Sequence, residues 1–318
     1  MPRAAAAACS WTEPRPDLAS HEFAGASAWV LEIIGLYSQG DPAVNQNALL
    51  VGRKKAIEML QRGASVQLDQ VCDSLRVRVI NETGHKLPTG HIEGRRVWLN
   101  VKVFDAKDNM LIEYGHYDYA EAHLDEPSTK IYEMHVGLSQ AAASLLGLPA
   151  GVTTRMALAD TIEKDNRIPP RGFNNAAYEA GGAPAVGAVY ADGQYWDDTL
   201  FALPPGAARA VATVNYQTVT RHYIEALRDN NFTDHWGDTL HDLWVATDRA
   251  PPIPMTSATL DLVNNGPSAD LNGDGTVSGA DLGMLLAAWG TPLHDLDGNG
   301  VVSGSDLGIM LGAWGPCQ

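Results

Sequence analysis

Two twelve-residue segments near the end of the chain carry acidic and amide side chains at the same spacing. Each opens with Asp-Leu-(Asn/Asp)-Gly-(Asp/Asn)-Gly, has Ser at the ninth position and ends in Asp at the twelfth. Calcium takes about six to eight oxygen ligands, and a twelve-residue loop supplies them from positions 1, 3, 5, 7, 9 and 12. The sequence therefore predicts two calcium ions, one in Asp270–Asp281 and one in Asp295–Asp306.

Both loops supply oxygen atoms at every ligand position. The predicted ligands of the first ion are Asp270, Asn272, Asp274, the carbonyl of Thr276, Ser278 and Asp281. The predicted ligands of the second ion are Asp295, Asp297, Asn299, the carbonyl of Val301, Ser303 and Asp306. Gly275 and Gly300 fall at position 6, where the chain must turn sharply. Because Asp and Asn exchange places at positions 3 and 5, each loop keeps three carboxylates.

The loops belong to a repeat, since residues 270–290 and 295–315 are identical at 14 of 21 positions. An Asp- and Gly-rich surface turn is the alternative, but it explains neither the repetition nor the Asp at position 12. After each loop an apolar stripe at helical spacing predicts a helix, and two such helices would pack in a small core that calcium stabilises. The stripes are Leu282, Leu285, Leu286 and Trp289, then Leu307, Met310, Leu311 and Trp314.

In this pattern residues 270–315 resemble type I dockerins, which lack the entering helix of an EF-hand and use Asp at position 12. The resemblance implies that the paired helices dock onto a cohesin-like protein domain, in extracellular assemblies that degrade polysaccharide. Gly279-Ala280 and Gly304-Ser305 occupy positions that help to set cohesin choice in that family, and they depart from its common Ser/Thr pairs. The identity of the partner therefore stays open.

Charge and composition exclude several classes of function. The net charge of −16 argues against nucleic-acid binding, and residues 257–318 carry seven Asp without a single Lys or Arg. The sequence contains no apolar run of the roughly 18 residues that a membrane span needs. Cys9, Cys72 and Cys317 are too few for a disulfide framework, which leaves the redox compartment open. Ala4–Ala8 is too short for a secretory signal, so we expect a start that was assigned too far downstream.

The periodicity of the apolar residues predicts an α+β chain. Residues 26–37 and 43–62 have helical spacing, and residues 221–227 form a short helix. Alternation predicts strands at residues 75–80, 97–103, 110–114 and 210–216. The expected order is a short helical N-terminal segment, a β-sandwich-like domain, a linker and an all-α dockerin-like module. The expected boundaries are residues 1–68, 69–256, 257–268 and 269–318.

The first 256 residues contain no CxxCH, GxSxG, GxGxxG, Walker A or HExxH motif, so no catalytic residue is predicted. Their distinctive stretches resemble the non-haem C-terminal β domain of bacterial multihaem c-type cytochromes, over residues 20–255. These stretches are residues 81–90 (Asn-Glu-Thr-Gly-His-Lys-Leu-Pro-Thr-Gly), 93–98, 166–173, 192–197 and 216–217. The resemblance implies His85 and His21 as haem ligands, with a loop-fixing hydrogen bond as the alternative for His85. Without CxxCH, haem would have to come from another segment or chain.

The sequence thus favours a calcium-binding, dockerin-type interaction protein that tethers a non-catalytic β-rich domain to an extracellular or cell-surface assembly. One alternative is the C-terminal fragment of a multihaem cytochrome oxidoreductase, partnered by a haem-bearing protein or segment. Another is a glycan-binding or polysaccharide-degrading component of a cellulosome-like assembly. In-frame CxxCH codons upstream of Met1 would identify the cytochrome fragment, and glycan binding or hydrolysis by residues 1–256 would identify the glycan-active component.

Overall fold

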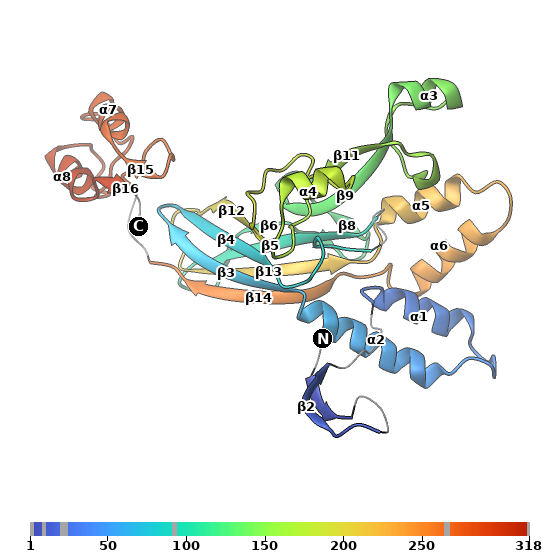
Figure 1. The fold of residues 1–318 in the computed structure, drawn as a ribbon. Coiled ribbons are helices and arrows are strands. Elements are labelled where there is room, and N and C mark those ends of the chain that lie inside the picture. The colour runs from blue at the N-terminus through green and yellow to red at the C-terminus, as the bar shows by residue number, and fades with distance from the viewer. Residues whose placement is uncertain (1–2, 8–10, 20–24, 91–93, 264–267, 317–318) are drawn as a thin grey trace. The chain divides into compact units, whose positions relative to one another are not determined.

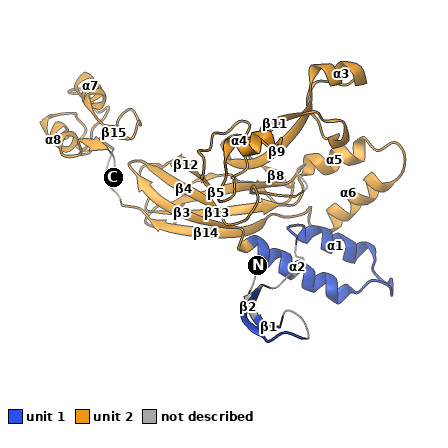
Figure 2. Cartoon of the chain, viewed as in Figure 1, with its two compact units in different colours: residues 1–60 blue, residues 61–318 orange. Residues whose placement is uncertain are grey.

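The computed structural model describes residues 3–7, 11–19, 25–90, 94–263 and 268–316 (Figure 1). The chain divides into two compact units, residues 1–60 and 61–318 (Figure 2). It is an α+β chain whose sheets are antiparallel. Among the described residues, no helix combines the length and the apolar character needed to cross a bilayer.

The first unit pairs a β-hairpin with two helices. Its elements are β1 (Arg3–Ala6), β2 (Arg15–Ala19), α1 (Ala28–Tyr37) and α2 (Gln46–Gln61). The two predicted helices are confirmed. The N-terminal segment expected to be helical over residues 1–68 also contains strands, because the Ala-rich start pairs with residues 15–19. Pairing between strands here outweighs the high helix propensity of Ala.

The second unit contains a seven-stranded sheet in the order β10-β9-β5-β13-β14, with β11 also paired to β9 and β6 paired to β5. Strand β13 lies in the interior of this sheet, between β5 and β14. The strands are β5 (Arg96–Phe104), β6 (Met110–Tyr114), β9 (Ile131–Leu138), β10 (Gly151–Val152), β11 (Thr161–Asp165), β13 (Arg209–Gln217) and β14 (Ile253–Asp261).

A smaller sheet, in the order β12-β4-β3, completes the core of this unit. Its strands are β3 (Ala64–Val71), β4 (Ser74–Asn81) and β12 (Trp196–Ala202). Every second residue of β4 is buried, as the alternation predicted, and strand β13 contacts both β3 and β4. The predicted strands within β4, β5, β6 and β13 are confirmed. A two-stranded ladder joins β7 (Tyr117–Asp118) to β8 (His123–Leu124).

Helices occupy the connections between the strands. Three of them begin at a residue whose side chain accepts a hydrogen bond from a backbone N–H of the first turn, namely Ser139, Asn174 and Thr220. The predicted helix at residues 221–227 is confirmed within α5. The helices are α3 (Gln140–Leu146), α4 (Asn175–Ala180), α5 (Arg221–Asp229) and α6 (Trp236–Ala246).

One expected boundary and the expected all-α character of the C-terminal module differ from the structure. Strand β14 continues to Asp261, so residues 257–261 pair with β13 instead of starting a linker. The C-terminal module is also not all-α. Besides α7 (Gly279–Ala287) and α8 (Gly304–Gly312), it contains β15 (Thr276–Val277) paired with β16 (Gly315–Pro316). This pairing joins the first loop to residues 315–316. A local sequence pattern does not predict a contact between segments so far apart in the chain.

A buried ion-pair network joins the turn after β4 to the end of β11. The Asp165 carboxylate accepts from Lys86 Nζ at 2.7 Å and from Arg167 Nε at 2.8 Å. Asp165 is fully buried and Lys86 is 6% exposed. Lys86 also donates to the carbonyls of Ala183 and Pro184. The network thus anchors residues 183–184 as well, and burial lowers the pKa of Lys86 despite the pairing with Asp165.

We expect Asp165→Asn to destabilise the chain by about 3 kcal/mol, because it leaves the buried Lys86 and the partly buried Arg167 without a counter-charge. The matched control is Asp198→Asn, since Asp198 pairs with Arg78 at the surface, where an ion pair contributes about 1 kcal/mol or less. Urea unfolding followed by intrinsic fluorescence measures both variants. Equal urea midpoints for the two variants would contradict the claim that Asp165 stabilises the fold more than Asp198 does.

Candidate metal centre

The two loops predicted to bind calcium each run into a short helix. Helix α7 follows the first loop and α8 follows the second. Ser278 and Ser303, at position 9, are the N-caps of these helices. Asp281 and Asp306, at position 12, complete a capping box by accepting from the backbone N–H of the N-cap Ser. The last predicted ligands of each loop therefore also start its helix.

The aspartate at position 1 organises the turn of each loop. Asp270 Oδ1 accepts from Gly273 N at 2.9 Å and Oδ2 accepts from Gly275 N at 2.8 Å. Asp295 makes the equivalent bonds to its own loop, including one from Gly300 N to Oδ2. Gly275 and Gly300 have φ angles of 85° and 95°, a left-handed conformation that favours glycine. The prediction of a sharp turn at position 6 is confirmed.

The aspartate at position 12 ties the two ends of its loop together. Asp306 Oδ1 accepts from Leu296 N at 2.7 Å and from Asp297 N at 3.2 Å, while Oδ2 accepts from Ser303 N at 2.7 Å. Asp281 makes the matching bonds in the first loop. Burial disfavours the charged form of Asp306, but these backbone N–H groups outweigh it and lower its pKa to about 2. Its carboxylate is thus ionised at neutral pH.

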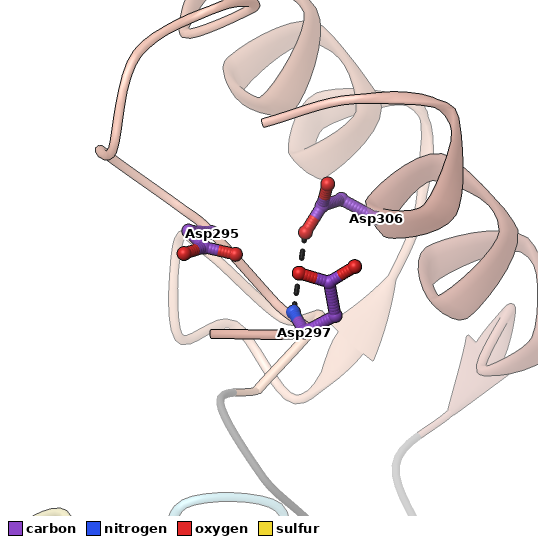
Figure 3. A group of neighbouring side chains, drawn as sticks. All are labelled: Asp295, Asp297 and Asp306. Atoms are coloured by element: carbon purple, nitrogen blue, oxygen red, sulfur yellow. Dashed lines mark hydrogen bonds between the residues drawn. The ribbon is translucent and has the colours of Figure 1, made fainter. Parts of the chain in front are cut away.

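Three carboxylates converge in the second loop (Figure 3). Asp295, Asp297 and Asp306 each place an oxygen within 4.8 Å of the others, and the described residues contain no second such group of three. In the first loop the third carboxylate is Asp274, at position 5 instead of position 3. The two loops also differ at Ser305, whose hydroxyl donates to Asp297 Oδ2 at 2.6 Å. The first loop has Ala280 at that position.

The donor set of the second loop fits a hard cation. Its three carboxylates, the Asn299 amide, the Ser303 hydroxyl and the Val301 carbonyl are all oxygen donors, which calcium prefers. Like charges this close repel one another, and a divalent ion would remove the repulsion. The first loop offers the same donor types in a different order. The chemistry of both loops therefore fits calcium, with the ligands named above.

The apolar stripe of each repeat is partly buried and partly exposed. Leu285 and Met310 are fully buried in the core of the module, with Val277, Leu296 and Val302. The other half of each stripe is exposed, although the sequence placed it in the core. The exposed residues are Leu286 and Trp289 on the first repeat and Leu311 and Trp314 on the second, each 48–54% exposed. Helices α7 and α8 contact one another, and this contact leaves these apolar residues of each repeat exposed.

Of the two predicted haem-ligand positions, the structure describes His85 alone. His85 is exposed in the turn after β4, where its backbone carbonyl accepts from Asn81 Nδ2 at 2.7 Å and Thr83 Oγ1 at 2.8 Å. His21 lies outside the described residues. Hydrogen bonds to the backbone carbonyl of His85 thus fix the turn, and His85 itself is exposed.

Sequence reasoning missed a pocket of about 550 Å³ in the second unit, because its lining comes from four separate segments. Most of its charges are paired. Arg96 Nη1 contacts Glu126 at 2.7 Å, and Glu133 contacts Lys164 at 2.7 Å and His135 at 3.1 Å. Burial would raise the pKa of Glu133, but His135 and Lys164 outweigh it and lower the pKa to about 2. The sequence also missed that Cys72 is disulfide-bonded.

Comparisons with known proteins give one distant likeness. No family model matches the chain, and no curated protein matches it. Among solved structures, a penta-heme cytochrome c552 from Thermochromatium tepidum is similar, with a TM-score of 0.40 and 15% sequence identity. The similarity covers 65% of this chain and 41% of that one.

The lowered pKa of Glu133 predicts acid sensitivity. Because the pKa is lower in the folded chain than its ordinary value of 4.5, ionised Glu133 stabilises the fold above about pH 4.5 and this contribution is lost as the pH falls towards 2. Between pH 7 and pH 3 the wild type should lose about 2 kcal/mol through this group.

Urea unfolding at both pH values measures that loss. In Glu133→Gln the difference between the two pH values should be smaller by about the same 2 kcal/mol. The exposed Glu179→Gln serves as control and should keep the wild-type difference. An unchanged pH dependence in Glu133→Gln would show that other groups cause the acid sensitivity.

Proposed function

We propose that this chain is a calcium-binding interaction protein. Its C-terminal module holds two calcium ions and docks, through α7 and α8, onto a cohesin-like domain of an extracellular or cell-surface assembly. The β-rich part of the second unit is then the tethered cargo, without a catalytic role of its own. The observation that carries the proposal is the convergence of Asp295, Asp297 and Asp306 at the start of α8.

Support for calcium comes from how the carboxylates are held. Backbone N–H groups fix Asp295 and Asp306 before any ion arrives, so little ordering is needed on binding. No Lys or Arg occurs in residues 257–318 to neutralise these acids. A bound calcium ion would supply that positive charge. Since Asp281 and Asp306 also cap their helices, ion binding would stabilise α7 and α8 directly.

Support for docking comes from exposed apolar residues on the two helices and directly after them. Trp289 and Trp314 stand at equivalent positions of the repeat, each about half exposed beside an exposed Leu. Trp is enriched among the residues that contribute most to protein–protein binding, and large exposed apolar patches mark interaction sites. Their duplication in both repeats indicates a surface that serves recognition, because the core of the module is complete without them.

Calcium titration of the full chain tests the ion sites. Isothermal titration calorimetry should give close to two ions per chain, with a gain in helicity by circular dichroism. Asp281→Ala and Asp306→Ala should each remove one ion, because each deletes the carboxylate that closes its loop. Asp261→Ala, in strand β14 outside both loops, should bind two ions. Absence of both binding heat and helicity change in the wild type would refute the calcium proposal.

Binding to a panel of cohesin domains in the presence of calcium tests the docking surface. Trp289→Ala or Trp314→Ala should weaken the complex by about 2 kcal/mol, roughly 30-fold in Kd, if that residue lies at the interface. Val189→Ala, also highly exposed but in the β-rich part, should leave the affinity unchanged. If no cohesin binds, or if both Trp variants bind as tightly as the wild type, this docking assignment is wrong even where calcium binding holds.

A further inference from the structure

The pocket of the β-rich part is built by the fold itself. Strands β5, β8 and β9 and helix α5, with residues that flank them, supply its lining. Its volume of about 550 Å³ lies within the usual range of ligand pockets. Charged and apolar side chains both line it, and their hydrogen-bonding groups indicate which class of ligand would fit.

Three acidic residues line the pocket, and each is held through one carboxylate oxygen. In every case Oε1 accepts from a basic side chain, in the pairs Arg96–Glu126 at 2.7 Å, Lys164–Glu133 at 2.7 Å and Arg221–Glu225 at 2.8 Å. Within the part of the chain that the structure describes, the Oε2 atoms of the three acids accept no hydrogen bond. The pocket therefore offers acceptor oxygens although its acidic charges are neutralised.

Hydrogen-bond donors line the same pocket. Arg96 is 4% exposed, and it donates through Nε to Gln217 at 2.9 Å and through Nη1 to Glu126. Its Nη2 donates to none of the described residues, although a guanidinium carries five N–H donors. His123 and His222 are exposed in the lining, and a neutral imidazole both donates and accepts. A buried guanidinium with an unused N–H group favours a ligand that brings an acceptor.

Apolar side chains complete the wall. Leu124 is buried, and Met134 and Tyr223 are partly buried. Gly94 approaches Tyr223 so closely that a Cβ at residue 94 would lie 2.9 Å from Tyr223 Cβ. Its φ of 74° also favours glycine. Glycine at this position therefore allows an aromatic side chain to lie in the pocket wall.

This combination distinguishes between classes of ligand. An anion would meet three carboxylates, and a cation would meet Arg96 and Arg221, so neither finds a matching charge. A hydroxyl group can donate to a carboxylate and accept from a guanidinium. The C–H groups of a sugar ring can in addition pack against apolar side chains.

We propose that this pocket binds a neutral oligosaccharide. Arg96 Nη2 donates to a sugar oxygen, the Oε2 atoms of the three acids accept from sugar hydroxyls, and His222 contacts a further hydroxyl. Tyr223 and Leu124 pack against the ring. The inference goes beyond calcium binding and docking and depends on neither of them.

Saturation-transfer NMR and isothermal titration calorimetry with the full chain test the class of ligand. The neutral probes are the trisaccharides of cellulose, xylan, mannan and starch. The charged probes are trigalacturonate, which is an anion, and the trimer of chitosan, which is a cation. At least one neutral probe should bind, and it should bind more tightly than either charged probe. Failure of every neutral probe, or tighter binding of a charged one, would overturn the proposal.

Two variants test whether the ligand lies in this pocket. Glu225→Ala removes one acceptor, while Arg221 keeps a carboxylate partner because it also donates to Glu121 at 3.2 Å. This variant should weaken binding of the neutral probe about tenfold, and His222→Ala should weaken it roughly fivefold. Glu179→Ala, exposed on α4 outside the pocket, should bind as the wild type does. Circular dichroism checks that each variant is folded. Wild-type affinity in both pocket variants would overturn the proposal.

Discussion

The concentration of aspartates in a tail without Lys or Arg is the constraint on which the C-terminal module depends. Carboxylates that lie close together repel one another, and the protein offsets this with backbone N–H groups from the loops themselves. Asp306 accepts from N–H groups at the beginning of its loop and from the N-cap Ser303, and Asp281 does the same in the first loop. In each repeat the Asp at position 12 therefore both closes the loop and caps the start of the helix.

Acidic residues in the β-rich part are balanced differently. Asp165 meets Lys86 and Arg167 in the interior, and Asp198 meets Arg78 at the surface, so the chain supplies its own cations there. The module lacks such residues, and backbone dipoles carry only partial positive charge. This contrast between two parts of one chain supports the proposal that a metal ion supplies the missing positive charge in the module.

What the sequence could predict depended on how local the signal was. Alternation predicted β4 and β13 because one face of each strand is buried, and loop spacing predicted the turns at Gly275 and Gly300. Contacts between distant segments left no local pattern. The pairing of residues 276–277 with 315–316 is one example and the disulfide at Cys72 is another. The sequence also could not predict which residues of the apolar stripes face solvent, because the buried and the exposed residues of each stripe are all apolar.

Contacts inside the fold account for some of the distinctive residues of the sequence but not for others. The most distinctive stretch of the β-rich part, residues 81–90, uses its polar groups internally: Asn81 binds three carbonyls through Nδ2, and Lys86 is buried against Asp165. Its unusual sequence is therefore accounted for by the fold. Trp289 and Trp314 have no such account, since they lie half exposed outside a complete core. A large apolar side chain kept at the surface in both repeats costs solvation free energy, which contact with a partner would recover.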